Sequence, residues 1–350
     1  MAADEHERAP VSGVVGPSGR GAGWYHGDCH VHTRRSHGGE LTPQQLTAAA
    51  REMGLDFLVI TEHNAASTPE EWAPFASDDL LIIAGQEVVT ETGHWLALGL
   101  EPDQVIDRRA GLVDHGAAQV HQVGGLCVVA HPHAPYPSGT FTHPMHGFDA
   151  VEVWNGPWSS DLPWQADNET ALAQWGHALA QWGHALAIDL HQGRWRPAVG
   201  NSDVHLPGQL GTPQTVVHTE DLSAAGILAG IRAGRCWITE SAEIGLSVTA
   251  HADDQHAGIG QSLGTGGQSV LVDVTVSGVP SGTVTLHTDR GQVHRDVLPD
   301  NGTGSLEWST TAAESAFVRV EVRHPSGYLA ALTNPIILAG DRSWENPQRD

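Results

Sequence analysis

The residues of this chain that could carry chemistry are histidines and carboxylates that follow short apolar runs. In chain order they are His30, His32, His37, His63, Glu87, His94, His131, His133, Asp203 and His205. Side chains at positions i and i+2 of a strand point the same way, so the pairs 30/32 and 203/205 each offer two ligands to one centre. Imidazole and carboxylate together suit Zn, Mn or Fe. The pattern therefore predicts a metal centre built from several strand ends.

The elements that must position these side chains alternate along the sequence. Apolar runs such as DFLVITEHN (56–64) and LCVVAHPH (126–133) are typical of buried strands. Between such runs we expect helices over 43–53, from Thr68, and over 109–123, 168–191 and 221–233. This alternation predicts an α/β fold with a largely parallel sheet or barrel, in which the carboxyl ends of the strands meet at one edge.

The composition and hydrophobic pattern of the sequence change at about residue 240. Short runs rich in Val and Thr then alternate apolar and polar residues between Gly, Asp, Pro and Ser turns. Such runs predict a β-sandwich-like region, whose scattered histidines we expect to be solvated. The chain thus divides into a flexible leader (1–23), an α/β region (24–240), a β-rich region (241–340) and a tail (341–350).

Composition narrows the function further. The 17 basic residues are all Arg, against 41 acidic residues, which gives a formal net charge of −24. Without Lys the chain has no Schiff-base lysine and no phosphate loop of the Walker type. A surface this acidic should repel nucleic-acid backbones and anionic lipid, so we expect neither nucleic acid nor membrane as a partner.

The location of the protein is predicted from its cysteines and its N-terminus. Cys29, Cys127 and Cys236 are far apart and form no CxxC motif, which favours a reducing compartment, the cytoplasm. The first residues lack the basic start and apolar core of a secretion signal, and no apolar stretch approaches the length of a membrane span.

A short repeat lies in the fourth expected helix. ALAQWGH at 171–177 recurs at 178–184, which keeps Trp175 and Trp182, and also His177 and His184, near one helical face. The stripe could bind a metal or ligand, but periodic apolar positions more often pack in a core. We therefore interpret the repeat as a duplicated segment that lengthens one helix.

Several motifs together resemble the PHP (polymerase and histidinol phosphatase) superfamily. They are GDCHVHTRRSHGG (27–39), VITEHN (59–64), GQEV (85–88), AHP (130–132) and GNSDVH (200–205). Further stretches resemble its carbaryl-hydrolase branch, namely FDAVEVWNG (148–156), IRAGRCWIT (231–239) and LAALTNPI (329–336). The resemblance covers about residues 24–340. It implies a distorted (β/α)7 barrel of the PHP type, with two or three divalent metal ions at the carboxyl ends of the strands.

The resemblance also implies how the ligands divide among three metal sites. One site would use His30, His32, Glu87 and Asp203, and a second would use Glu87, His94 and His131, with Glu87 shared. The third would use His37, His63 and His205. Asp28 and Glu62 would orient ligands from behind.

The expected reaction is hydrolysis by a metal-activated water. A leaving-group acid would assist it, and the candidates are His133 and, if it binds no metal, His205. Arg34 and Arg35 follow the first motif and could hold a phosphate or carboxylate of the substrate. Trp154 and Asn155 follow the strand at 148–153 and could line an aromatic substrate pocket.

Three functions remain open from sequence alone. The PHP resemblance favours a phosphoesterase, whereas the carbaryl-hydrolase branch, the absence of Lys and the 12 Trp residues are compatible with hydrolysis of a carbamate or carboxyl ester. A non-catalytic metal-binding or interaction module is the third. For both hydrolases the partner would be a small-molecule ester, and the sequence predicts no oligomeric state.

Overall fold

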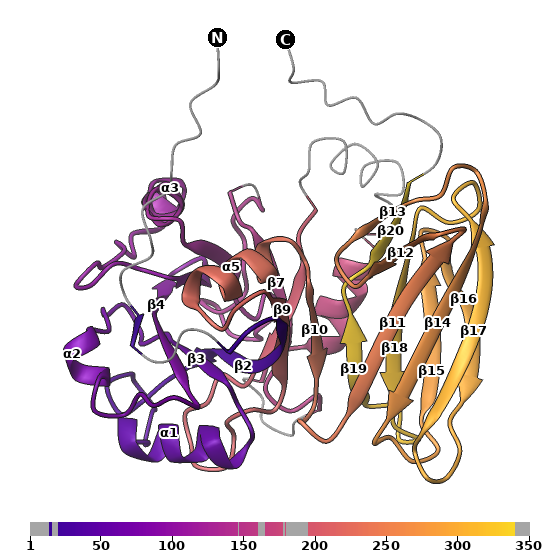
Figure 1. Cartoon of the computed structure of the whole chain (residues 1–350). Helices are drawn as coiled ribbons and strands as arrows, with labels where there is room; N and C mark the ends of the chain where they lie inside the picture. Colours follow the sequence, from indigo (N-terminus) through magenta and orange to yellow (C-terminus); the bar gives the residue numbers. More distant parts are fainter. Residues whose placement is uncertain are drawn as a thin grey trace.

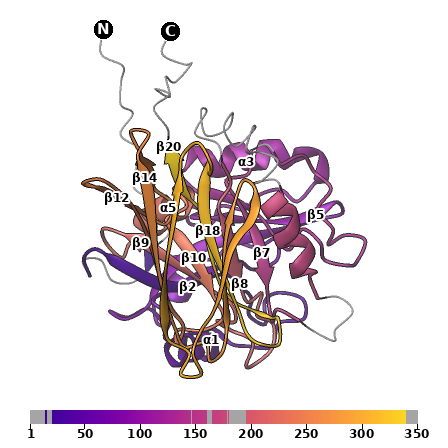
Figure 2. The same ribbon diagram turned by 90° about the vertical axis from the view of Figure 1, so that its right-hand side faces the viewer.

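The computed structural model describes residues 14–15, 20–145, 147–159, 165–177, 179 and 195–339. Figure 1 shows an α/β region, coloured indigo to salmon, beside a region built only from strands, coloured orange to yellow. Figure 2 views the molecule from the side of the strand-only region, with β14 and β18 in front of the α/β region.

The α/β region contains strands and helices in alternation, although the strands outnumber the helices among the described residues. Its strands are β1 (Val14–Val15), β2 (Gly23–Val31), β3 (Phe57–Ile60), β4 (Leu81–Thr90), β5 (Gly93–Leu98), β6 (Leu126–Val129), β7 (Ala150–Asn155), β8 (Ala198–Asn201), β9 (Gln214–Thr219) and β10 (Cys236–Thr239). Its helices are α1 (Pro43–Glu52), α2 (Pro69–Trp72), η1 (Ala110–Leu112), α3 (Val113–Gln122), α5 (Ala224–Arg232) and a helix over 168–177.

The helices begin and end where local sequence signals place them. Thr42 caps α1 by accepting from Gln45 N, and the Gln45 side chain accepts from the backbone of Thr42, which makes a capping box. Pro43 occupies the first turn, and α1 ends just before Gly54, which has a positive φ of 72°. Ser223 caps α5 in the same way, by accepting from Gly226 N.

The sheet of the α/β region mixes parallel and antiparallel pairs. β2, β3 and β4 are parallel to one another, as are β6, β7 and β8, but β5 runs antiparallel between β4 and β6. β9 also pairs antiparallel with β2. A parallel bridge between Val31 and Val204 brings the end of β2 beside the segment that follows β8.

This arrangement confirms the α/β architecture and differs in detail from a regular strand–helix repeat. The turn from β4 to β5 is a tight hairpin, so no crossover helix separates these strands. The polar residues after β2, β3, β6 and β8 nevertheless meet at one edge of the sheet, because these strands run the same way. The (β/α)7 barrel itself stays a prediction.

The strand-only region consists of two sheets around one core. One has the order β12-β11-β14-β17, and β13, β20, β18, β15 and β16 belong to the other, larger sheet. β14 buries every second residue, Val270 to Val276, against residues of β18. The strands of the strand-only region are β11 (Gly245–Ala252), β12 (Gln255–Gly258), β13 (Ser262–Gly264), β14 (Ser269–Ser277), β15 (Thr283–Thr288), β16 (Gly291–Val297), β17 (Gly304–Thr311), β18 (Phe317–Arg323), β19 (Leu329–Thr333) and β20 (Ile336–Ala339).

The two regions are joined by a continuous sheet rather than by a bare linker. β10 pairs antiparallel with β9 on one side and with β19 on the other. Beside this junction the Asn334 side chain accepts from Ala198 N (2.8 Å) and donates to the carbonyls of Ala198 and Cys236 (both 2.9 Å). The domain boundary near residue 240 stays a prediction, and the hydrogen-bonded sheet passes through it.

Several expectations fall at the limits of the described residues. Within the expected flexible leader, Val14 and Val15 form the short strand β1, which pairs with Ile83 and Ile82 of β4. In the first copy of the repeat, Trp175 is buried and donates to Arg196 O, consistent with packing. The second copy beyond residue 179 and the tail at 341–350 lie outside the described residues. No helix among the described residues is long and apolar enough to cross a membrane.

Candidate metal centre

Eight of the nine predicted metal ligands converge at the common edge of the sheet. Their ligand atoms form three overlapping groups, and within each group the atoms lie within 4.8 Å of one another. The groups are His30, His32, Glu87 and Asp203; Glu87, His94 and His131; and His32, His63 and His205.

Glu87 is at the centre of the cluster because it belongs to two of these groups. Its Oε1 lies 2.8 Å from His94 Nδ1 and 3.2 Å from His131 Nε2. Its Oε2 lies 3.0 Å from His63 Nε2 and 3.3 Å from His32 Nε2. The carboxylate is only 1% exposed, so its charge is withdrawn from water.

The local structure explains how residues distant in sequence reach Glu87. In the β4–β5 hairpin Glu87 is paired with Leu96, and His94, two residues away, lies on the same face. At the end of β2, His30 and His32 are separated by one residue and both point to the cluster, as their spacing predicts.

Asp203 closes the cluster from the segment after β8. Its Oδ1 lies 3.2 Å from His30 Nε2 and 3.0 Å from His32 Nε2. Asp203 and His131 have positive φ values, 51° and 24°, which non-glycine residues rarely adopt. The surrounding hydrogen bonds must hold this strained backbone at two candidate ligands.

One of the groups that hold the ligands in place is Glu152 of β7, which the sequence analysis did not single out. Its carboxylate is 1% exposed and accepts from His30 Nδ1 (3.2 Å) and from His131 N (2.9 Å). It also accepts from the side chains of Asn155 and Asn201, both at 2.9 Å. The signal available in the sequence was a carboxylate inside an apolar strand, since such a group needs several donors.

Asp28 and Glu62 also support the ligands, as the family resemblance implied. Asp28 is fully buried and accepts from the backbone N–H groups of His30 and Ser202, both at 3.2 Å. Glu62 acts through Ser36, whose hydroxyl donates to Glu62 Oε2 (2.5 Å) and lies 3.1 Å from His32 Nδ1. Both carboxylates therefore fix ligand orientation from behind.

The donor set fits a divalent metal. Buried atoms of the cluster have no hydrogen-bond partner, which is costly in a protein interior. They are His30 Nε2, His32 Nε2, Glu87 Oε2, His94 Nε2, His131 Nδ1 and Asp203 Oδ1. A cation among them would take up lone pairs that form no hydrogen bond in the protein.

The electrostatics of the cluster also fit a bound cation. Burial alone would lower the pKa of His30, but the charges of Asp203, Glu152 and Glu87 raise this pKa well above its ordinary value. Burial then lowers the pKa of His32 to about 3, and the nearby charge of His30 adds to this effect. The pKa of Glu87 lies well below its ordinary value, because His30 and its other imidazole partners outweigh its burial. The carboxylates thus draw positive charge into the site.

Three predicted residues of the first motif lie outside the cluster. His37 is exposed and belongs to none of the three groups, and His32 takes the place expected for it. The reason is that the chain turns at Ser36 and directs that side chain, rather than His37, towards His32. Arg35 is exposed and paired with Glu71 of α2 (2.5 Å), whereas Arg34 is exposed with no ion pair among the described residues.

The expected aromatic wall is not formed by Trp154. Its side chain is fully buried in the core and contacts the ring of Trp158, with centroids 5.2 Å apart. Asn155 is also buried, and it donates to Glu152 and to Asp203 (3.3 Å), so it positions carboxylates. His133 is half-buried, lies 2.8 Å from Gln174 Oε1 and belongs to none of the groups.

Tyr136 is a second residue that the sequence analysis missed. Its ring centroid lies 6.0 Å from that of His94 and 6.5 Å from that of His131. Burial raises the pKa of Tyr136 well above its ordinary value, and the charges of Glu87 and Asp203 act in the same direction. Gly139 leaves room for this ring, since a Cβ there would lie 2.4 Å from it. The cluster therefore has a protonated phenol at its side.

Known sequences and structures were compared with this chain. A family described as PHP-associated matches residues 183–236, and no curated protein matches. A two-domain protein from Bacteroides vulgatus, described as containing a predicted PHP-like metal-dependent phosphoesterase, is 16% identical with a TM-score of 0.47, and the match covers 95% of this chain and 100% of that one. PsfC from Pseudomonas syringae is 16% identical over 59% of this chain and 88% of that one, with a TM-score of 0.39. A lesion-specific endonuclease from Pyrococcus furiosus is 14% identical over 61% of this chain and 56% of that one, with a TM-score of 0.37.

Proposed function

We propose that this chain is a metal-dependent hydrolase of the PHP type and that its substrates are phosphoesters. The observation that carries the proposal is the convergence of eight candidate ligand side chains, six of which have a buried atom without a hydrogen-bond partner. The PHP-like motifs and the PHP-associated match at 183–236 support the family, and with it a variant of the (β/α)7 barrel. The carbaryl-hydrolase branch stays a prediction.

Some residues of the chain would hold the metal ions, and others keep those ligands in position. The group of His30, His32, Glu87 and Asp203 would hold one ion, and the group of Glu87, His94 and His131 a second. Divalent ions bound there would acidify a water molecule and polarise the ester. Glu152 keeps the His30 ring and the His131 backbone in place through its hydrogen bonds, so the ligands meet a metal without reorganising.

Two residues near the cluster are suited to contact the substrate. Arg34 follows the first ligand pair and has no ion pair among the described residues, so its guanidinium is available to a phosphate. The protonated phenol of Tyr136 can donate a hydrogen bond to an ester oxygen at the cluster. A phosphoester fits these two donors.

A carbamate or carboxyl ester has less support at this site. Its sequence arguments were the carbaryl-hydrolase resemblance, the absence of Lys and the number of Trp residues, and of the residues expected to line an aromatic pocket Trp154 is in the core. A non-catalytic metal-binding module has the same ligand cluster, so only turnover separates it from a hydrolase.

The decisive experiment measures metal content and turnover in the same preparations. We expect at least one divalent ion per chain after reconstitution, and hydrolysis of p-nitrophenyl phosphate or its bis ester that is lost on chelation and restored by metal. His131→Ala should abolish this activity, whereas His251→Ala, in the strand-only region and outside the three ligand groups, should leave it unchanged. Bound metal without turnover of any ester would favour the non-catalytic module, and turnover only of p-nitrophenyl acetate or an aryl carbamate would overturn the phosphoester assignment.

A further inference from the structure

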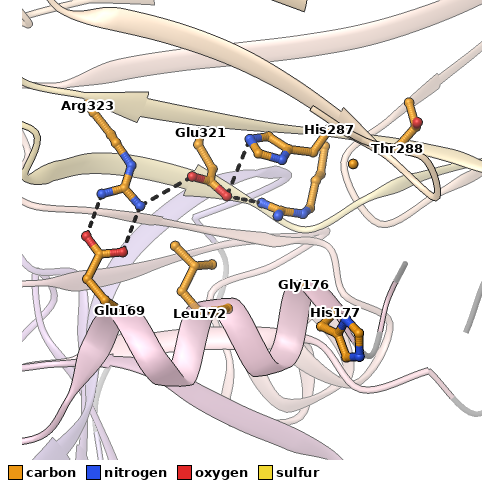
Figure 3. A pocket seen from close by; sticks show the side chains of 11 residues that line it. Glu169, Leu172, Gly176, His177, His287, Thr288, Glu321 and Arg323 are labelled. Carbon is orange, nitrogen blue, oxygen red and sulfur yellow. Dashed lines mark hydrogen bonds and ion pairs between the residues drawn. The ribbon is translucent and has the colours of Figure 1, made fainter. Parts of the chain in front are cut away.

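A second cavity, away from the metal cluster, lies between the 168–177 helix and the strand-only region. Its volume is about 360 Å³. Figure 3 shows Glu169, Leu172, Gly176 and His177 on the helix facing Glu321, Arg323 and His287 on the strands. This volume is at the lower end of the range for small-molecule sites.

The two walls differ in chemistry. The helix contributes one face, at positions 169, 172, 173, 176 and 177, which includes the apolar surface of Leu172 and Ala173. β18 contributes alternate residues, Arg319, Glu321 and Arg323, which share one face of the sheet. A ligand in the cavity would therefore meet an apolar wall on one side and charged groups on the other.

The charged groups that line the cavity form ion pairs with one another. Arg323 binds Glu169 through two contacts, at 2.7 and 3.2 Å, and reaches Glu321 at 3.5 Å. Glu321 Oε1 also accepts from Arg319 Nη1 at 2.7 Å. Burial, followed by the charge of Arg319, lowers the pKa of His287 to about 4, so this imidazole is neutral near pH 7. Both carboxylates are thus neutralised by the two arginines.

Arg319 retains donors that nothing else on the wall uses. The residue is 5% exposed, yet among the described residues only its Nη1 has a hydrogen-bond partner. The Trp175 ring packs 5.3 Å from its guanidinium carbon and holds the group in place. Nη2 faces the helix at Gly176, where a Cβ would lie 3.0 Å away. Glycine inside a helix is destabilising, but here it leaves space in front of a buried cation.

We propose that this cavity binds a small organic monocarboxylate. The free Nε–H and Nη2–H groups of a guanidinium form the edge that pairs with both oxygens of a carboxylate. The apolar tail of such a ligand would pack on Leu172 and Ala173. Glu169 and Glu321 line the same cavity and disfavour a dianion such as phosphate.

This site is separate from the metal cluster and does not depend on the proposed function. None of the residues lining the cavity belongs to the three ligand groups. Binding should therefore survive removal of metal, which distinguishes it from carboxylate coordination at the cluster.

The test uses hexanoate as the probe, with hexanamide and inorganic phosphate as matched alternatives. In calorimetric or ligand-observed NMR titrations of the full chain, we expect hexanoate to bind with a Kd on the order of 1 mM, with or without chelator. Hexanamide and phosphate should bind at least about tenfold more weakly, because a charge-assisted bond is lost or a second charge is added.

Two variants locate the binding. Arg319→Gln removes the donors and should weaken hexanoate binding at least about tenfold. Because this change also breaks the Glu321 pair, Ala173→Trp provides a second test that fills the cavity from the helix and replaces no member of the ion pairs. Thr170→Leu, exposed on the same helix, is the control and should bind as the wild type. The proposal is overturned if hexanoate does not bind, if hexanamide or phosphate binds as tightly as hexanoate, if chelation abolishes binding, or if Ala173→Trp binds hexanoate normally.

Discussion

Glu87 of the metal cluster and Glu321 beside the second cavity are both buried carboxylates, but their surroundings are opposite. Among the described residues, Glu87 is contacted by five histidines and by no arginine, and its Oε2 lacks a hydrogen-bond partner. Glu321 is contacted by Arg319 and Arg323, and both of its oxygens are paired. The two sites bury similar charge and compensate it differently.

The difference indicates which site would need an external cation. Arginine keeps its charge at every ordinary pH, so the compensation of Glu321 is built into the chain. Histidine is neutral near pH 7 unless a carboxylate raises its pKa, so the cluster around Glu87 is completed by a proton or by a metal. The composition reflects the same division, since the 17 basic residues are all Arg and the chain has 23 His.

The largest test of this comparison is Glu87→Gln. The amide keeps the shape but removes the charge shared by two ligand groups. We expect metal binding to fall by more than about 100-fold, since even residues behind the ligands commonly contribute 10–100-fold, and activity should fall with it. Metal per chain is measured by elemental analysis. Glu169→Gln is the control at the other cavity, and loss of metal from it would break the comparison.

Glu152→Gln tests the residues behind the ligands. A glutamine amide would direct N–H groups at some of the four donors that Glu152 now accepts from. We expect metal affinity to fall about 10–100-fold, with activity restored at high metal concentration. Competition with a chromophoric chelator measures the affinity. Unchanged affinity would show that Glu152 only fills space.

Tyr136→Phe separates substrate contact from metal binding. Removing the hydroxyl should lower kcat/KM about tenfold, because one hydrogen bond to a charged oxygen is lost, while metal content stays at the wild-type value. Steady-state kinetics on p-nitrophenyl phosphate check this. A wild-type kcat/KM would exclude contact between the phenol and the substrate.

The smallest expected effect is at the second cavity and depends on pH. The folded pKa of His287 is lowered to about 4, so the unfolded chain binds a proton below about pH 6.5 that the folded chain does not. Between pH 7 and 5.5 this residue should therefore cost the folded state about 1 kcal/mol. Urea unfolding in the presence of chelator measures the loss, and His287→Gln should reduce it. An equal loss in that variant would contradict the lowered pKa.

The sequence predicted which side chains gather at the cluster better than it predicted their surroundings. Motif spacing brought together His30 and His32, because alternation on a strand is a local property. Thr42, Pro43 and Gly54 likewise located α1 through contacts within a few residues. His37 lies outside the three ligand groups, although the family resemblance implied that it is a ligand. The direction of a side chain in a turn depends on which neighbour, here Ser36, makes the hydrogen bonds.

The missed features are tertiary. The four donors of Glu152 come from residues that lie up to 122 positions from it in sequence. The burial of Trp154 depends on its contact with Trp158 in the core. The antiparallel direction of β5 depends on its hairpin with β4, and that of β9 on its pairing with β2. None of these contacts leaves a periodic signal that a single sequence displays.

The hydrogen bonds of Asn334 have a consequence for how the chain can be divided. A fragment ending near residue 240 would lose the partner of Ala198 N and leave β10 with an unpaired edge, which is a template for aggregation. The strand-only region therefore covers the edge of β10 in the α/β region, and this role does not depend on whether the strand-only region binds a ligand. We expect the two regions to unfold in one transition and to be expressed poorly as separate pieces.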